Sequence, residues 1–197
     1  MKKIYVIFIL SYTLGSIPFG LIITTIIKGI NLKETGSKSI GATNVARTTG
    51  SKKLVALTLF LDSFKGFISV YIAQIFFCDW NLCVYISAIL VVLGHIFPIW
   101  LKFNGGKGIA TTLGILVALN VYVALIFTFI WLGVFFIFRY SSCASLVAIS
   151  IAIAISPFFQ KNLFFTLLSV AILVFFKHRK NITNLLHGKE YKFHKKS

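Results

Sequence analysis

Three polar, glycine-rich stretches interrupt an otherwise apolar chain, and they hold most of the residue types that can do chemistry. They run from Gly36 to Arg47, from Gly94 to Thr112 and from His178 to Glu190. In the first stretch, glycine permits the turns that bring backbone N–H groups toward one anion. Ser37, Thr43 and Asn44 can donate side-chain hydrogen bonds, and Arg47 offers a planar fork that suits phosphate. The alternative is a plain Gly- and Ser-rich loop that caps the next helix.

The second stretch places Gly105, Gly106, Lys107 and Gly108 directly before a predicted helix. The N–H groups and the dipole of a helix start favour an anion, and Lys107 supplies the counter-charge. The spacing Gly-x4-Gly-Lys-Ser/Thr is missing, so the stretch is not a nucleotide P-loop. A flexible interfacial turn with a snorkelling lysine remains the alternative. His95, in the preceding helix, is by itself more often a packing residue than a catalyst.

The third stretch ends the last apolar tract. Its cationic residues complement the dipole of a helix C-terminus and need no catalytic role. A role in complementing the helix dipole does not explain Asn181 and Glu190. Glu190 is one of only four acidic residues and lies in a strongly basic tail. Ser142, next to Arg139, adds a hydroxyl donor to the same predicted side.

The elements that must position these residues are membrane helices. Of the 197 residues, 58% are hydrophobic and only 12% charged, against about half and about a quarter in soluble domains. Long uncharged tracts must be helices in hydrocarbon, since the alternating pattern of a barrel is absent. The sequence therefore predicts an all-α, polytopic integral membrane protein with one domain, 1–197. The tracts are 4–27, 82–101, 109–138, 140–160 and 162–176, with 54–77 interrupted only by Asp62 and Lys65.

The number of crossings follows from length and charge. Residues 109–138 would make a helix of about 45 Å, too long for a core of about 30 Å, so we predict a break near Asn120. Seven transmembrane helices result, the first of them spanning 4–27. Sixteen of the 20 Lys and Arg residues then fall on one side, which the positive-inside rule makes cytoplasmic. The N-terminus lies outside and the C-terminus inside.

The remaining patterns exclude several classes of function. A net charge of +16 can indicate a nucleic-acid binder, but the basic residues cluster between apolar tracts, so we expect no nucleic acid. No metal-ligand spacing, Ser-His-Asp set, paired carboxylates or His-x4-Asp pair occurs, and we expect no metal and no cofactor. Asp62 and Lys65, three apart on a helix, are expected to pair. A basic rim beside apolar walls suits phosphate and an acyl chain, with catalysis by positioning and charge stabilisation.

The chain resembles the bacterial membrane family of acyl-phosphate:glycerol-3-phosphate acyltransferases over nearly its whole length. The resemblance is carried by GSIPFG (15–20), LDSFKG (61–66), GATNVAR (41–47) and GHIFPIWLKFNGGKGIATT (94–112). It implies seven helices and acyl transfer from acyl-phosphate to the 1-hydroxyl of glycerol 3-phosphate, giving lysophosphatidate and phosphate. This would be the first acylation of phospholipid synthesis, at the cytoplasmic side of a bacterial inner membrane.

The resemblance also implies site residues. The catalytic candidates are Ser37, Arg47, Lys107, His178, Asn181 and Glu190. The substrate-binding candidates are Gly36, Gly41, Asn44, His95, Gly105, Gly106, Gly108, Thr111 and Ser142. Two positions depart from the family pattern: Ser39 stands where the family usually has Asn, and Asn184 where it usually has Arg.

Two other classes of function stay open. A transporter of phosphorylated solutes would share the basic rim and broken helices, although polar residues do not recur at mid-bilayer depth along several helices. A scaffold would leave the glycine-rich loops unexplained. For the acyltransferase, the expected partners are the two substrates, the bilayer and a soluble acyl-phosphate synthase.

Overall fold

The structure, a computed structural model, describes residues 2–76 and 81–193, and within these ranges the chain is helical with no strand. It falls into two compact units, residues 1–119 and 120–197. The first unit contains α1 (Lys2–Ser16), α2 (Phe19–Lys28), α3 (Ala42–Thr49), α4 (Lys52–Phe76), α5 (Asn81–Ile96), η1 (Ile99–Leu101) and α6 (Ile109–Leu119). The second contains α7 (Val121–Phe138), α8 (Ser141–Ile155), η2 (Ser156–Phe158) and α9 (Lys161–Leu186).

The helices have the length and composition of a membrane protein. Six stretches in the described ranges are long and apolar enough to cross a bilayer, namely 4–28, 52–76, 82–101, 121–138, 141–158 and 161–186. A seventh apolar helix, α6, has only 11 residues. Large apolar side chains such as Ile26 and Phe129 are exposed, as expected where lipid replaces water. The prediction of an all-α membrane fold is confirmed.

The first apolar tract is one candidate membrane span, residues 4–28, close to the predicted 4–27, but it is not one continuous helix as predicted. α1 ends at Ser16 and α2 begins at Phe19. Pro18 has no N–H and its ring clashes with the preceding turn, which explains the interruption. The N–H of Phe19 donates to the carbonyl of Ile17 across the break, at 3.1 Å. The same carbonyl also accepts a hydrogen bond from Nζ of Lys65 on α4.

The predicted break near Asn120 is confirmed. α6 ends at Leu119, and Asn120 is the N-cap of α7, its side-chain oxygen accepting the N–H of Val123 at 3.1 Å. Asparagine is a preferred N-cap because its short side chain reaches the free N–H groups of the first turn.

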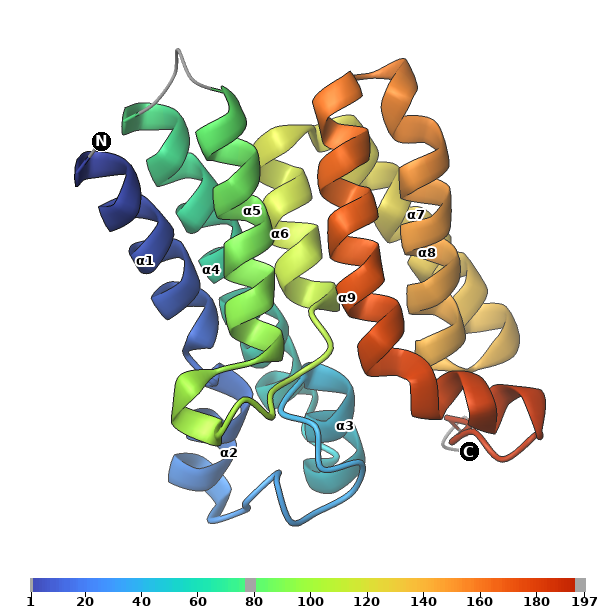
Figure 1. Cartoon of the computed structure of the whole chain (residues 1–197). Coiled ribbons are helices and arrows are strands. Elements are labelled where there is room, and N and C mark those ends of the chain that lie inside the picture. Colours follow the sequence, from blue (N-terminus) through green and yellow to red (C-terminus); the bar gives the residue numbers. More distant parts are fainter. Residues whose placement is uncertain (1, 77–80, 194–197) are drawn as a thin grey trace. The chain divides into compact units, whose positions relative to one another are not determined.

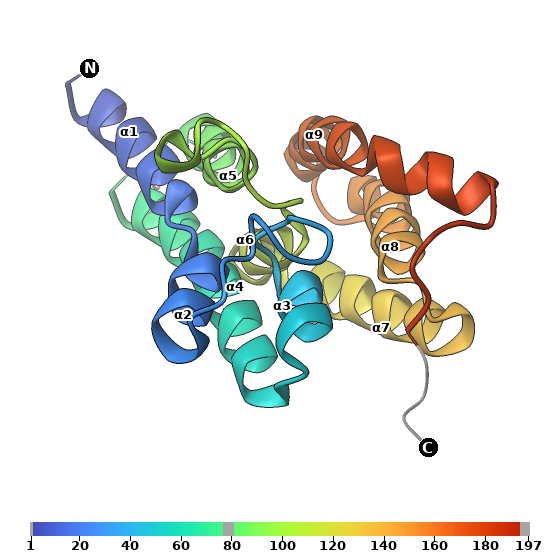
Figure 2. The same ribbon diagram turned by 90° about the horizontal axis from the view of Figure 1, so that it is seen from below.

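In the first unit the long helices pack through glycine. α1, α4, α5 and α6 lie alongside one another, with α2 and α3 at one end (Figures 1 and 2). On α6, a Cβ at Gly114 would overlap the carbonyl of Ser63 on α4. On α1, a Cβ at Gly15 would overlap the carbonyl of Val91 on α5. Small residues let membrane helices approach until their backbones touch.

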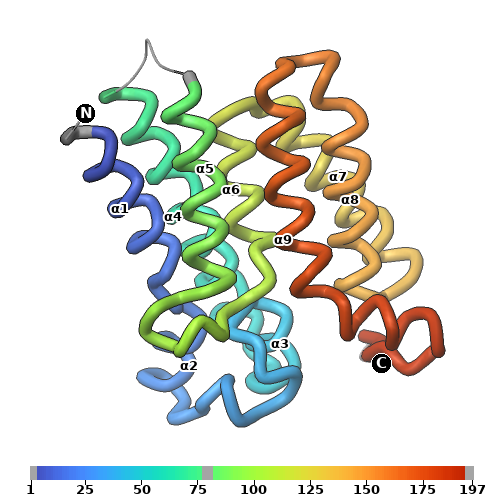
Figure 3. The backbone as a smooth tube through the Cα atoms, in the orientation of Figure 1, coloured from blue at the N-terminus to red at the C-terminus, as the bar shows by residue number. Residues whose placement is uncertain are grey.

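The second unit is a set of three helices closed by the C-terminal segment. The indole of Trp131 on α7 donates to the hydroxyl of Ser145 on α8 at 3.1 Å. The last part of α9 turns away from the axis of its first part, as the tube in Figure 3 shows. Beyond α9, the N–H of Phe193 donates to the carbonyl of Arg139 at 3.0 Å, and its ring packs against Phe135.

The glycine contacts predict a position-specific effect on stability. Gly114→Ala should lower the free energy of unfolding by about 1–3 kcal/mol, because the helices must separate to admit the methyl group. Gly133→Ala is the matched control, since no atom of the described chain lies near that Cβ. Thermal unfolding in one detergent measures both. Equal midpoints for Gly114→Ala and wild type would contradict the packing described.

Candidate functional site

The first polar loop, residues 29–41, is folded around the side chain of Asn44. This amide is 1% exposed. Its Nδ2 donates to the carbonyls of Ser39 at 2.8 Å and Thr35 at 3.1 Å, and its Oδ1 accepts the backbone N–H of Ser37 at 2.8 Å. Nδ2 also lies 3.3 Å from the carbonyl of Leu32, so one side chain contacts four points of a loop whose own backbone makes only turn hydrogen bonds. Asn44 therefore shapes the loop; its predicted contact with substrate stays a prediction.

Left-handed residues give this loop its curvature, beginning with Gly29 at φ +64°. Gly36 and Lys38 have φ of +59° and +57°. A side chain at Gly36 would be strained and would also overlap Oδ1 of Asn44. Gly41, the N-cap of α3, accepts the N–H groups of Asn44 and Val45. Arg47 then lies in the last turn of α3, half-buried, with its Nε enclosed.

The second polar loop, residues 102–108, folds back onto the end of α5. The N–H of Gly105 donates to the carbonyl of Ile96 at 3.0 Å, and that of Gly106 to the carbonyl of His95 at 3.1 Å. A Cβ at Gly106 would overlap Nε2 of His95. Position 106 therefore requires glycine because the His95 ring lies where a side chain would be. Lys107 follows, half-buried, just before α6.

The loop's exit into α6 is fixed by its last glycine. Gly108 has φ of +86°, and its carbonyl accepts both the N–H and the hydroxyl of Thr112, at 2.7 and 2.8 Å. Thr111 is fully buried, and a Cβ at Gly66 of α4 would overlap its carbonyl. In this structure Thr111 contributes to helix packing, and its predicted role in substrate binding stays a prediction.

The two loops are joined directly. Nζ of Lys33 donates to the carbonyl of Asn104 at 2.7 Å, and both loops lie at the end of the first unit where α2 and α3 are found (Figure 2). Partial burial lowers the pKa of Lys33, because desolvation disfavours its charged form. The sequence shows a basic loop but not this contact, since the two residues are 71 positions apart.

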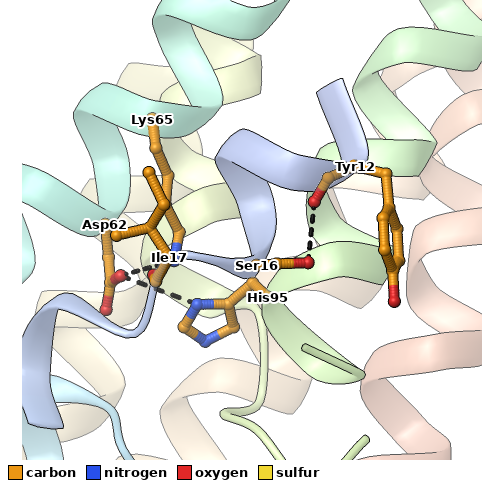
Figure 4. Close-up of polar contacts among 6 residues, drawn as sticks. All are labelled: Tyr12, Ser16, Ile17, Asp62, Lys65 and His95. Atoms are coloured by element: carbon orange, nitrogen blue, oxygen red, sulfur yellow. Dashed lines mark hydrogen bonds and ion pairs between the residues drawn. The ribbon is translucent and has the colours of Figure 1, made fainter. Parts of the chain in front are cut away.

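A buried polar cluster lies beneath the second loop. Nζ of Lys65 is 2.8 Å from Oδ1 of Asp62 and donates to the carbonyl of Ile17 at 2.8 Å. Nδ1 of His95 is 3.6 Å from the same carboxylate oxygen. Figure 4 shows the three side chains converging from α4 and α5 on the break between α1 and α2. The predicted Asp62–Lys65 pair is confirmed.

The second unit brings two predicted site residues, Ser142 and Asn181, onto the carboxylate of a third, Glu190. Oε1 of Glu190 accepts from the hydroxyl of Ser142 at 2.9 Å and from Nδ2 of Asn181 at 2.8 Å. Glu190 is 8% exposed although it lies in the basic tail. His178, one turn earlier on α9, is buried with Nδ1 2.9 Å from the carbonyl of Val174. The tail is thereby held against α8 and α9.

Ser39 and Asn184, which depart from the family pattern, both make contacts through their backbone carbonyls. Ser39 contributes its carbonyl to the Asn44 contact, which any residue at that position can do. The carbonyl of Asn184 likewise accepts the N–H of Lys189 at 2.7 Å. Among the described residues, no three His, Cys, Asp or Glu side chains are grouped to hold a metal ion.

Comparison with known proteins identifies the family. The family model "Glycerol-3-phosphate acyltransferase" matches residues 5–188. A glycerol-3-phosphate acyltransferase of Wolbachia pipientis wMel is 68% identical over 196 residues, covering 99% of this chain and all of the relative. That of Ehrlichia canis is 45% identical over 187 residues, covering 94% of this chain and 96% of the relative.

Solved structures are also similar. The crystal structure of PlsY (YgiH), an integral membrane glycerol 3-phosphate acyltransferase, in its glycerol 3-phosphate form has a TM-score of 0.91 and 39% identity, covering 98% of this chain and 96% of that one. Its lysophosphatidic acid form gives 0.88 and 37%, with the same coverage.

Together, the apolar helices and the matches define a membrane-embedded acyltransferase of phospholipid synthesis. The chain belongs to the glycerol-3-phosphate acyltransferase family.

The Asn44 contacts predict a strong effect from a small change. Asn44→Asp removes both amide donors and places a carboxylate among carbonyl oxygens, so we expect a loss of about 1–3 kcal/mol in unfolding free energy. Asn120→Asp keeps the accepting oxygen of its N-cap and should have little effect. Thermal unfolding in detergent compares the two. A loop built around Asn44 is contradicted if both variants melt alike.

Proposed function

We propose that this protein transfers an acyl group from acyl-phosphate to the 1-hydroxyl of glycerol 3-phosphate, giving lysophosphatidate and phosphate. The main support is that Lys33 and Asn104 tie the two polar loops of the first unit together. Lys107 lies in the second loop, and Arg47 lies on α3, which follows the first. The crystallised forms of the similar PlsY, with glycerol 3-phosphate and with lysophosphatidic acid, support the acceptor and the product.

In the proposed binding step, the loops hold phosphate. The guanidinium of Arg47 offers paired N–H donors that match phosphate oxygens, and Lys107 adds a point charge. The start of α6, directly after Gly108, adds backbone N–H groups and the positive end of a helix dipole. Ser37 lies on the curved part of the first loop and contributes its hydroxyl.

The proposed chemical step needs no acyl-enzyme. The 1-hydroxyl oxygen attacks the acyl carbonyl carbon and forms the new ester bond, while the bond from that carbon to the bridging phosphate oxygen breaks. The hydroxyl proton passes to a phosphate oxygen of the donor. Acyl-phosphate is already activated, so the protein contributes orientation and stabilisation of developing negative charge.

The cluster in the second unit is proposed to serve the same reaction. By accepting from Ser142 and Asn181, the Glu190 carboxylate fixes the rotamers of both. Asn181 is thereby held in a defined orientation, and His178 one turn earlier on the same helix is proposed to act with it. We expect residues 1–197 to work as one acyltransferase domain.

The membrane arrangement is proposed from charge. With α6 counted as a short crossing, the chain crosses seven times, with an outside N-terminus and a cytoplasmic C-terminus. The polar loops then face the cytoplasmic side of a bacterial inner membrane, where glycerol 3-phosphate and a soluble acyl-phosphate synthase are accessible.

Replacing one arginine tests the binding step. Arg47→Ala should lower activity about 100-fold or more, since each charge-assisted hydrogen bond contributes about 1.5–3 kcal/mol. Arg179→Ala is the control, because this guanidinium stacks on Phe176 and has no assigned role. Initial rates are measured with purified, monodisperse protein. Near-normal turnover by Arg47→Ala would remove the central assignment, and an acyl group trapped on Ser37 would replace direct transfer by a covalent route.

The identity of the acyl donor is tested by comparing three classes of acyl compound. Purified protein is given glycerol 3-phosphate with acyl-phosphate, acyl-CoA or acyl carrier protein, and lysophosphatidate is measured. We expect turnover with acyl-phosphate alone, because the proposed step uses phosphate both as leaving group and as proton acceptor. Equal turnover with a thioester would contradict this step, and solute flux into liposomes without lipid product would favour a transporter.

A further inference from the structure

The buried pair of Asp62 and Lys65 is unusual in its position. Both side chains are 2% exposed, near the middle of the 25-residue apolar helix α4. Charged groups are costly at such depth, and apolar side chains of similar volume often give equal or greater stability than a buried ion pair. Stability alone therefore does not explain the pair, but its contacts with neighbouring groups do.

The ammonium group acts on the break between α1 and α2. Nζ of Lys65 donates to the carbonyl of Ile17 and lies 5.6 Å from the centre of the Phe19 ring. These contacts fix the direction in which α2 leaves the break. α2 in turn touches the end of the first polar loop, because a Cβ at Gly20 would overlap the carbonyl of Ile40. Lys65 is thus connected to the first loop through α2.

The carboxylate acts on the second polar loop through a histidine. Oδ1 of Asp62 faces Nδ1 of His95 at 3.6 Å. The other ring nitrogen, Nε2, faces Gly106, and the N–H of Gly106 donates to the backbone carbonyl of His95. The imidazole is therefore held between α4 and the second loop (Figure 4). Asp62 is thus connected to the second loop through His95.

We propose that Asp62 and Lys65 are positioning residues that set the two phosphate-binding loops relative to one another. The carboxylate holds the His95 ring against Gly106, and the ammonium holds the α1–α2 break against α4. This inference rests on the proposed function for its kinetic consequence. Neither residue touches substrate; each acts through a neighbour.

Two uncharged double variants separate positioning from ordinary stability. Asp62→Ala/Lys65→Met removes both charges and both contacts, and leaves no unpaired buried ion. Asp62→Asn/Lys65→Met is equally uncharged but keeps an oxygen facing Nδ1 of His95. Ser69→Ala, a buried hydroxyl on the same helix with no partner among the described residues, is the control.

We expect the two double variants to lose different amounts of kcat/KM. With saturating acyl-phosphate, kcat/KM for glycerol 3-phosphate should fall about 10–100-fold in the Ala/Met variant, since small misplacements of binding groups have effects of this size. The Asn/Met variant should recover several-fold of that loss, while Ser69→Ala matches wild type. Wild-type kcat/KM in the Ala/Met variant, or equal losses in both double variants, would overturn the proposal.

A second measurement does not depend on the acyl donor. Hydrogen–deuterium exchange of residues 29–41 and 102–108 should be faster in the Ala/Met variant than in Ser69→Ala. If that variant does not fold, Asp62→Asn/Lys65→Met is used, which removes the ammonium contact with Ile17. Unchanged exchange of residues 29–41 in that variant overturns the positioning role of Lys65. A wild-type protein that transfers no acyl group from any donor would instead overturn the proposed function, while the exchange comparison still tests the pair.

Discussion

The constraint on which the structure depends is that backbone polar groups have no water to bind inside a membrane, so every break in a helix must be closed by the protein. At Pro18 the freed carbonyl of Ile17 is taken by Lys65. At Asn120 the free N–H of Val123 is taken by the cap side chain. Each interruption of an apolar helix thereby becomes a fixed structural point.

The same constraint explains how the polar loops keep their shapes. Neither loop is part of a helix or a sheet, so each depends on turn hydrogen bonds and on contacts with one neighbouring residue. Asn44 satisfies the first loop from within, and His95 accepts the second through its carbonyl and packs its ring on Gly106. Rigid loops of this kind hold N–H groups in place without the entropic cost of ordering them when a phosphate binds.

Glycine serves two different purposes in this chain. Gly36 and Gly108 adopt positive φ, which other residues tolerate poorly. Gly15 and Gly114 have no such conformation and are needed because a helix backbone lies where their Cβ would be. Close helix packing and tight loops therefore meet in one unit, with α4 touching α6 along one side and reaching the α1–α2 break with Lys65.

The sequence by itself determined the features that depend on local composition. Hydropathy identified the apolar helices, length placed the break at Asn120, and the spacing of Asp62 and Lys65 predicted their pairing. The family followed from the GATNVAR and GGKG stretches. Sequence reasoning missed the break after Ser16, although Pro18 signalled it, because the tract reads as uniformly apolar.

Only the tertiary structure decided what each polar residue contacts. The meeting of Lys33 with Asn104, of Lys65 with Ile17 and of Ser142 with Glu190 joins positions 48 to 71 residues apart. Such contacts depend on how distant segments pack together, and no residue's own preference determines that. Composition therefore predicts which residues are polar within the membrane, while packing selects their partners.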